Sequence, residues 1–266
     1  MSLTIITIPD KNYDKDLNPV LENASNDDLS VLVDYLKKKL SEDLTSSEVY
    51  KRYSPYHQKY YGVIAKEIRD MGGNSFANAW RKQGPTYQEI VYDVAKKLKA
   101  DVSKSDPVVV MENAIMEKVL KQAIGKMSEE EQLSLVKELG YESLSKGGTA
   151  TMIAIQAFRM GGFKSYQLTL IVANQIARLI LGRGLMLTTN AAIARWASIL
   201  TGPIGWVIGG AWTAVDVAGP AYSVTIPCVI HIAMLRKKQS MKTCSNCQIE
   251  LGDATVKFCP ECGEKQ

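Results

Sequence analysis

The sequence predicts a mainly α-helical protein, in which a helical bundle is followed by a small C-terminal zinc ribbon. Three observations support this prediction. Apolar residues recur at helical spacing through the first half of the chain, capping residues and glycines bound those stretches, and the tail holds two Cys-x2-Cys pairs. The 266 residues, 46% of them hydrophobic and 23% charged, are enough to bury a sizeable core.

Residues 1–146 are expected to form an amphipathic helical domain. A run at residues 3–8 has the composition of an edge strand or a tail, and Pro9 ends it. The expected helices are bounded by caps, glycines and prolines, and run from Ser25 to Leu40, Tyr56 to Met71, Asn74 to Gly84, Pro85 to Leu98, Pro107 to Ile124 and Ser128 to Gly140. Short helices with short connections favour a bundle.

Two of these helix starts carry specific signals. Pro85 suits the first turn of its helix, where its missing N–H costs no hydrogen bond. Ser128 and Glu131 have the spacing of a capping box, and Leu133 and Val136 are expected on the buried face of the helix that follows. None of these features indicates catalysis.

The charges of the chain are distributed unevenly. Residues 1–146 carry 21 basic and 23 acidic side chains, whereas residues 147–241 carry 8 basic side chains and one acidic one, Asp216. We therefore expect three regions: an amphipathic helical domain at 1–146, an apolar, basic helical segment at 147–240 and the zinc ribbon at 241–266. The net charge of +4 is too small to indicate a nucleic-acid-binding protein by itself.

The middle segment contains two uncharged windows. Residues 196–215 are uncharged over 20 positions and residues 217–235 over 19, and a helix that crosses a bilayer needs about 20 predominantly apolar residues. The cationic residues at 236–238 resemble the flank of a membrane span. Internal prolines and glycines argue against simple spanning helices. The segment is therefore either membrane-embedded or the buried core of a bundle.

The arginines and lysines that precede Trp196 also allow two interpretations. They either contact anionic lipid headgroups or form a solvated face on which long side chains cover apolar surface. A nucleic-acid-binding role for the same basic segment would make the affinity fall steeply with salt concentration.

The tail carries the most specific motif of the sequence. Cys244 and Cys247 form one Cys-x2-Cys pair, Cys259 and Cys262 form the other, and 11 residues separate the pairs. Four thiolates in tetrahedral geometry are the preferred ligands of structural Zn²⁺ and leave no open position for catalysis. The alternatives are two disulfides or a rubredoxin-like iron site. Disulfides are disfavoured because no cationic and apolar signal segment opens the sequence, and the same observation predicts a cytoplasmic location, with or without association with the inner membrane.

Other candidate sites are weak. His57 is expected at the surface, and His231 with Cys228 is expected to be a core histidine beside an inert thiol, although a Cys–His nucleophile pair has the same spacing. The glycine-rich run at 72–75 is either a helix cap or an anion site. Glycine-rich phosphate loops and the common hydrolase motifs are absent from the sequence, so we expect no enzymatic activity.

Three stretches, at 72–78, 87–98 and 221–227, resemble the YaaW-like family of uncharacterised bacterial proteins. The resemblance covers roughly residues 17–240, and part of that family is grouped with a ubiquinol–cytochrome c chaperone-like domain. It implies a helical bacterial protein and supplies no catalytic residues to carry over. The zinc ribbon departs from the usual pattern of the family, which ends near residues 236–238.

Together these observations favour a non-enzymatic chaperone-like or adaptor protein, which acts through protein contacts, possesses a structural zinc ribbon and works either in solution or at a membrane. One alternative is a membrane-inserting effector of the pore-forming type that uses the glycine-rich segment 196–235. A second is nucleic-acid binding through the basic middle segment, which is disfavoured. The expected partners are proteins, with membrane lipids as a further possibility, and the tail, with a net charge of −1 and the single aromatic residue Phe258, is expected to contact protein.

Overall fold

The computed structural model of the chain describes residues 13–40, 42–73, 84–140, 149–185, 204, 221–241, 244–247, 251, 257–259 and 261–266. Within these residues the protein is mainly α-helical, as predicted, and the only β-structure is an isolated bridge between Phe258 and Lys265. The helices are α1 (Asn18–Glu22), α2 (Asn26–Leu40), α3 (Glu42–Ser46), α4 (Glu48–Tyr53), the 3₁₀ helix η2 (His57–Tyr60), α5 (Tyr61–Gly72), α7 (Tyr87–Lys97), α8 (Val108–Ile124), α9 (Glu129–Glu138), α10 (Ala150–Arg159), α11 (Gly162–Leu181) and α13 (Tyr222–Gln239).

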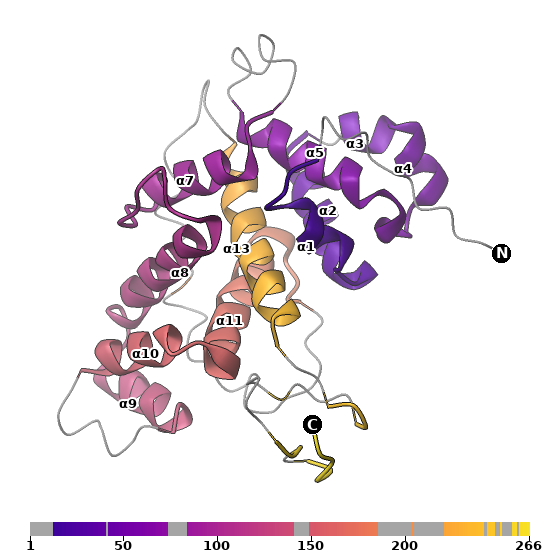
Figure 1. Cartoon of the computed structure of the whole chain (residues 1–266). Coiled ribbons are helices and arrows are strands. Elements are labelled where there is room, and N and C mark those ends of the chain that lie inside the picture. Colours follow the sequence, from indigo (N-terminus) through magenta and orange to yellow (C-terminus); the bar gives the residue numbers. More distant parts are fainter. Residues whose placement is uncertain are drawn as a thin grey trace.

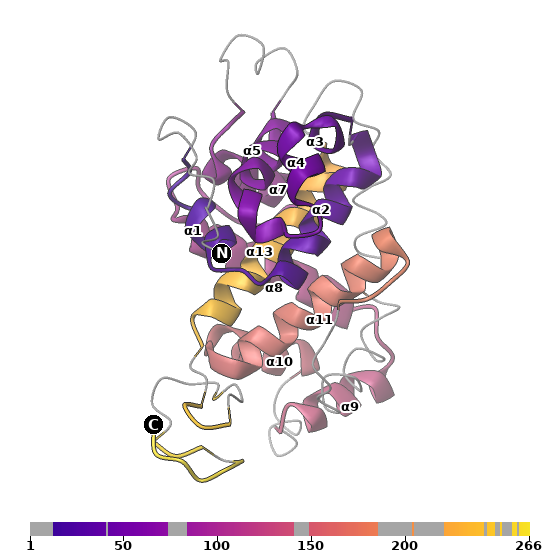
Figure 2. The same cartoon turned by 90° about the vertical axis from the view of Figure 1, so that its right-hand side faces the viewer.

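Helix α13 is the central element of the bundle (Figures 1 and 2). It contacts α1, α2, α5, α7, α8 and α11, and every residue from Val224 to Leu235 is buried. A helix that is apolar on all sides must be enclosed, because no face of it can be left to water. Pro227 lies inside this helix without ending it. The described part of the uncharged window 217–235 is therefore a core helix of the bundle.

One buried apolar cluster extends from Leu17 in the first region to Leu235 in the middle segment. The change in charge near residue 146 is thus a change of composition, and the core continues across it. Among the described residues, no helix combines the length and the apolar character that crossing a membrane requires. The strand or tail expected at 3–8, nearly all of the helix expected from Asn74 to Gly84, and the window 196–215 apart from Ile204 lie outside the described residues.

Ion pairs join the basic middle segment to the first region of the chain. Four basic side chains of the middle segment each pair with an acidic side chain of the first region: Arg159 with Glu117, Arg183 with Asp34, Arg236 with Glu112, and Lys238 with Asp28. Lys237 lies over the Phe158 ring, with its Nζ 4.8 Å from the ring centroid. Of the basic side chains that precede Trp196, Arg159 and Arg183 thus form ion pairs within the fold, and the cations at 236–238, which resembled the flank of a membrane span, contact the bundle.

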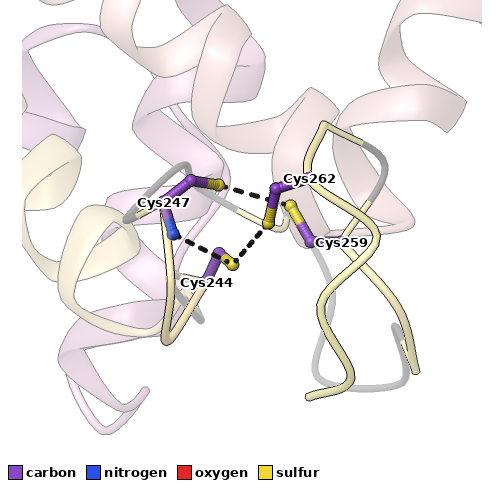
Figure 3. Close-up of side chains that lie close together, drawn as sticks. All are labelled: Cys244, Cys247, Cys259 and Cys262. Carbon is purple, nitrogen blue, oxygen red and sulfur yellow. Dashed lines mark hydrogen bonds between the residues drawn. The ribbon is translucent and has the colours of Figure 1, made fainter.

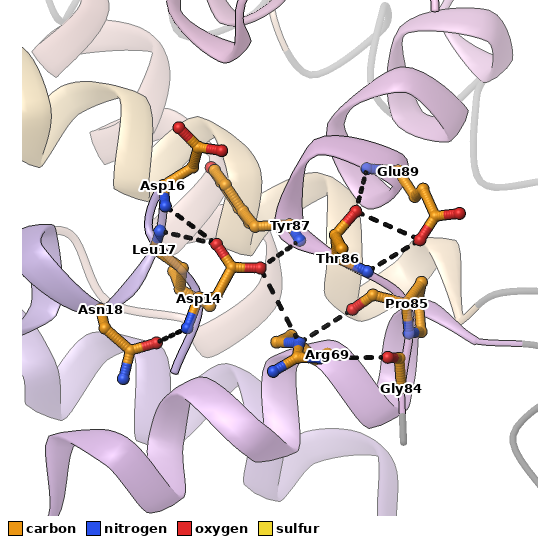
Figure 4. Close-up of polar contacts among 10 residues, drawn as sticks. All are labelled: Asp14, Asp16, Leu17, Asn18, Arg69, Gly84, Pro85, Thr86, Tyr87 and Glu89. Carbon is orange, nitrogen blue, oxygen red and sulfur yellow. Dashed lines mark hydrogen bonds and ion pairs between the residues drawn. The ribbon is translucent and has the colours of Figure 1, made fainter. Parts of the chain in front are cut away.

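A buried carboxylate joins three helices on one side of the bundle (Figure 4). One oxygen of Asp14 accepts backbone N–H groups just before α1, and the other accepts the backbone N–H of Tyr87 at 2.8 Å. Arg69 of α5 lies 3.9 Å from the same carboxylate and donates to the carbonyl of Pro85 at 2.9 Å. The start of α7 is thereby fixed against α1 and α5.

This arrangement corrects the expected start of α7. Pro85 lies before the helix, and Thr86 is the N-cap. The Thr86 hydroxyl accepts the backbone N–H of Glu89, and the Glu89 carboxylate accepts the backbone N–H of Thr86, which makes a complete capping box (Figure 4). A side-chain cap satisfies two orphan N–H groups, which a proline in the first turn cannot do.

Three further local predictions are wrong. The helix expected from Tyr56 begins as the 3₁₀ helix η2, and α5 starts only at Tyr61. The capping box of Ser128 is confirmed, but Leu133 is 58% exposed, because α9 packs through Leu135 and Val136. His57, expected at the surface, is buried.

His57 is held by contacts at two of its atoms. Its backbone N–H donates to the Asn26 side chain at 2.6 Å, and its ring Nδ1 lies 2.5 Å from the Tyr60 hydroxyl. Burial lowers the pKa of His57.

Candidate metal centre

The four cysteines of the tail lie close together (Figure 3), and the described C-terminal segments lie below the end of α13 in Figure 1. The sulfurs of Cys244, Cys247, Cys259 and Cys262 all lie within 4.8 Å of one another. Cys244 Sγ is 3.5 Å from Cys262 Sγ, and Cys247 Sγ is 3.5 Å from Cys259 Sγ. The predicted ligand set is therefore assembled in space, and both Cys-x2-Cys pairs contribute to it.

The spacing of the sulfurs fits a tetrahedral metal ion. With metal–sulfur bonds of about 2.3 Å, the edge of a tetrahedron of sulfurs is about 3.8 Å. The observed spacing of 3.5 Å to within 4.8 Å brackets that value. The four cysteines form no disulfide, since 3.5 Å is far beyond the roughly 2.05 Å of a disulfide bond. The donor set can thus hold one metal ion.

The backbone around each pair supports this geometry. In the first pair, the N–H groups of Asn246 and Cys247 point at Cys244 Sγ from 3.4 and 3.5 Å. In the second, Gly263 donates to the carbonyl of Cys259 at 2.9 Å and has φ +73°, a left-handed conformation that favours glycine. Each pair is therefore a tight turn that aims two sulfurs at the same point.

Cys244 is the most enclosed sulfur position. Cys244 and Cys259 are buried, whereas Cys247 and Cys262 are exposed. Burial raises the pKa of the Cys244 thiol, but the N–H groups of Cys247 and Asn246, with the Cys262 thiol, outweigh it and lower that pKa to about 6. A thiol with a lowered pKa is more readily converted to the thiolate that binds a metal.

Two residues that the sequence did not single out complete the centre. Leu251 packs with the two buried cysteines in a small apolar cluster of its own. The Gln266 side chain donates to Cys244 Sγ at 3.3 Å and accepts the N–H of Ser245 at 3.1 Å. An apolar residue between two cysteine pairs is a signal that can be read in a sequence, whereas nothing in the sequence indicates the contact of Gln266.

The module is attached to the bundle through the last turns of α13. Arg236 binds the buried Glu112 at 2.9 Å, Lys238 binds Asp28 at 3.0 Å, and the Gln239 side chain donates to the carbonyl of Val20 at 2.8 Å. Cys244 follows five residues after Gln239. The four-cysteine cluster therefore follows closely after a firmly anchored helix end.

The other sequence candidate, His231 with Cys228, lies in the core. Both side chains are buried, and His231 Nε2 lies 3.1 Å from the carbonyl oxygen of Asp28. Burial raises the pKa of Cys228 and lowers the pKa of His231 to about 4. A neutral thiol beside a neutral imidazole, both shielded from solvent, agrees with the expected core pair. The run at 72–75 is described only as far as Gly73.

The fold and the cysteine cluster define a class of protein: a helical bundle that carries a C-terminal cluster of four cysteines able to hold a metal ion. A UPF0174 protein of Helicobacter pylori strain J99 is 42% identical to this chain over 234 residues, which are 85% of this chain and 92% of the relative. The UPF0174 protein YaaW of Escherichia coli K12 is 30% identical over 210 residues, 77% of this chain and 84% of the relative.

The chain therefore belongs to the UPF0174 family, and the resemblance to YaaW-like proteins is confirmed. A UPF0174 protein of H. pylori strain 26695 is 38% identical over 209 residues and is covered along 100% of its length. No protein-family model and no solved structure matches the chain.

Proposed function

We propose that the protein is a non-enzymatic chaperone-like or adaptor protein, whose C-terminal module is folded around a structural Zn²⁺ and acts through contacts with another protein. The observation that carries this proposal is the convergence of four cysteine sulfurs within 4.8 Å. Four thiolates fill a tetrahedral shell and leave no position for water or substrate, so the metal serves structure and not catalysis.

Zinc is the metal that this donor set fits best. Four soft sulfur ligands in a tetrahedron select Zn²⁺ or iron, and paired Cys-x2-Cys turns with N–H groups aimed at sulfur suit a closed structural site. Four cysteines without a disulfide suit a reducing compartment, so a cytoplasmic location is part of the proposal.

The module also presents a side chain suited to protein contact. Phe258 precedes the buried Cys259, yet its own side chain is 60% exposed. Its backbone is fixed by the bridge to Lys265, so the ring is displayed from a rigid frame. Exposed aromatic side chains on a pre-organised surface are typical anchors of protein interfaces.

The proposal is tested by affinity capture with three matched variants, quantified by mass spectrometry. Cys259→Ser with Cys262→Ser removes the metal, and Phe258→Ser removes the exposed ring while leaving all four ligands. Val110→Ser removes a 50%-exposed apolar side chain from α8 and is the control. We expect one protein to be retained by the wild type and by Val110→Ser, and lost from the two module variants. A zinc content below one ion per chain in the wild type, or capture unaffected by both module variants while circular dichroism shows the bundle intact, would overturn the proposal.

A further inference from the structure

A group of cations and tyrosines covers the surface of α4 and η2. The Lys59 ammonium lies 5.4 Å from the centroid of the Tyr53 ring and 5.5 Å from that of Tyr56, and the Arg52 guanidinium lies 5.5 Å from the Tyr53 ring. Tyr56 is 63% exposed. We refer to Arg52, Tyr53, Tyr56 and Lys59 as the tyrosine–cation patch. In both views α4 lies at the opposite end of the bundle from the cysteine module (Figures 1 and 2).

The backbone that carries the patch is held rigidly by the bundle. The Asn26 side chain donates to the carbonyl of Pro55 at 3.0 Å and accepts the N–H of His57 at 2.6 Å. The Gln58 side chain donates to the carbonyl of Ala24 at 2.9 Å. Tyr60, the neighbour of Lys59, is buried. The exposed ring of Tyr56 is thus presented by an anchored turn, beside the half-buried ring of Tyr53, and little order has to be gained when a partner binds.

The patch has the composition of a stacking surface and lacks that of a membrane anchor. Among the described residues of α4, η2 and the connection between them, Tyr56 is the one large apolar side chain that is exposed. Exposed aliphatic side chains, such as those of Val109, Leu133 and Leu179, lie on other helices. Insertion into a lipid layer relies on aliphatic or tryptophan side chains. Tyrosine rings flanked by basic side chains instead suit bases that stack and phosphates that need a counter-charge.

Further cations lie near the patch, although residues 26–60 as a whole carry six basic and six acidic side chains. Lys37 of α2 lies 5.9 Å from the ring of Tyr50, which is one turn before Tyr53 on α4. Glu48 is paired with Lys51 at 3.3 Å, so its negative charge is offset locally. An anionic strand therefore meets several cations along α2, α4 and η2.

We propose that the tyrosine–cation patch binds single-stranded nucleic acid. One base stacks on the ring face of Tyr56 that Lys59 does not cover, a neighbouring base stacks beside Tyr53, and Arg52 and Lys59 contact the phosphates that join them. The site takes a short run of nucleotides with little sequence preference, because every base offers a face for stacking. It is separate from the basic middle segment considered from the sequence and is independent of the adaptor function proposed for the cysteine module.

Fluorescence anisotropy with labelled oligo-dT and oligo-U tests this proposal on the full-length protein. The two phosphate contacts of Arg52 and Lys59 give a slope of about −1.4 in log affinity against log salt, so binding weakens about sevenfold from about 50 mM to about 200 mM salt. Tyr56→Ala is expected to weaken binding about tenfold, whereas Tyr56→Phe, which keeps the ring, retains it. The charge variant Arg52→Gln with Lys59→Gln lowers the slope, since the number of phosphate contacts falls.

The controls keep the same chemistry at other places. Tyr13→Ala removes a tyrosine that is 47% exposed, and Lys126→Gln removes an exposed cation; neither is expected to change the affinity. Binding that Tyr56→Ala leaves unchanged would overturn the proposal, and so would the absence of any binding at low salt. A third result would also overturn the proposal: the wild type binds neither oligonucleotide but floats with phosphatidylglycerol vesicles, and the charge variant does not float. That result would assign the patch to a membrane surface.

Discussion

Helix α13 and the cysteine module follow each other directly in the chain, yet they are stabilised by different means. From Val224 to Leu235 the helix is enclosed by six other helices, and its side chains belong to the main apolar cluster of the protein. The module has a separate cluster, formed among the described residues by Cys244, Leu251 and Cys259. Three buried side chains release far too little free energy to order a segment of that length.

The bundle and the cysteine module differ in the interactions that order them. The bundle obtains its order from burial of apolar surface and from the ion pairs that join its two halves, so it does not depend on a ligand. On the proposed function, the module obtains its order from metal coordination, because metal binding and folding are then the same event. The anchored end of α13 connects the bundle to the module, but among the described residues no shared apolar cluster joins the two.

The largest expected effect separates the two regions. Chelation of zinc, or Cys259→Ser with Cys262→Ser, removes an interaction that is worth on the order of 10 kcal/mol in small zinc domains, and the module unfolds. The bundle keeps its helical circular dichroism and its melting temperature. Trypsin cleavage after Lys257 reports unfolding of the module, and the far-ultraviolet melting curve reports the bundle. A melting temperature of the bundle that falls with the zinc content would show that the two regions fold as one unit.

The second largest effect is expected from removing the cation of Arg236, which destabilises the bundle and leaves the module folded. Arg236 donates to Glu112, which is 3% exposed and also accepts the Tyr87 hydroxyl at 2.9 Å. Burial raises the pKa of Glu112, although Arg236 and Tyr87 oppose it. Arg236→Ala leaves this carboxylate buried without its cation, which costs about 3–5 kcal/mol of unfolding free energy in urea titrations. The zinc content should stay at one ion per chain.

Arg159 provides the matched control for Arg236. It also forms a two-pronged pair with a glutamate, at 2.8 and 2.7 Å to Glu117, but its side chain is 60% exposed. Because solvent screens an exposed pair, Arg159→Ala should change the unfolding free energy by no more than the error of the titration. The double variant Arg236→Met with Glu112→Leu should recover most of the lost stability, since it leaves no unpaired buried charge. Equal losses for Arg236→Ala and Arg159→Ala would refute this explanation.

The features that could be predicted from the sequence are those formed by residues that lie close together in it. The capping box of Ser128 and Glu131 spans one turn, and each Cys-x2-Cys pair is a local turn, so the residues themselves specify both. The choice between Leu133 and Leu135 on α9 was missed, because the buried face is set by α10, which lies further along the chain.

Contacts between distant residues were not predictable from one sequence. The charge imbalance between residues 1–146 and 147–241 was visible, but its meaning required the pairing of Arg236 with Glu112 across 124 positions. The burial of His57 likewise depends on Asn26, 31 positions away. The window 217–235 has the length of a membrane span and the composition of a core helix, and only the helices packed around α13 distinguish these.

The third effect appears only in acid and concerns His231 in α13. Burial lowers the pKa of His231 to about 4, with the Asp28 carboxylate and carbonyl opposing this and the Lys238 cation adding to it. The imidazole therefore stays neutral in the folded protein, whereas it takes up a proton near pH 6.5 when unfolded. The unfolded state binds more protons between these values, so stability falls as the pH drops from about 6.5 to about 4. The loss reaches about 2 kcal/mol at pH 5.

The contribution of His231 is isolated as a difference between two proteins. Urea titrations at neutral pH and at pH 5 are compared for the wild type and His231→Gln, which keeps a side-chain N–H for the carbonyl of Asp28 but does not titrate in this range. His57, whose pKa burial also lowers, and Glu112, whose pKa is raised, act equally in both proteins and cancel in the comparison. We expect the acid-induced loss to be smaller in His231→Gln, while the zinc-bound module protects Lys257 from trypsin equally in both. An identical acid-induced loss in the two proteins would mean that the imidazole is protonated inside the folded bundle, where the Asp28 carboxylate would be its counter-ion.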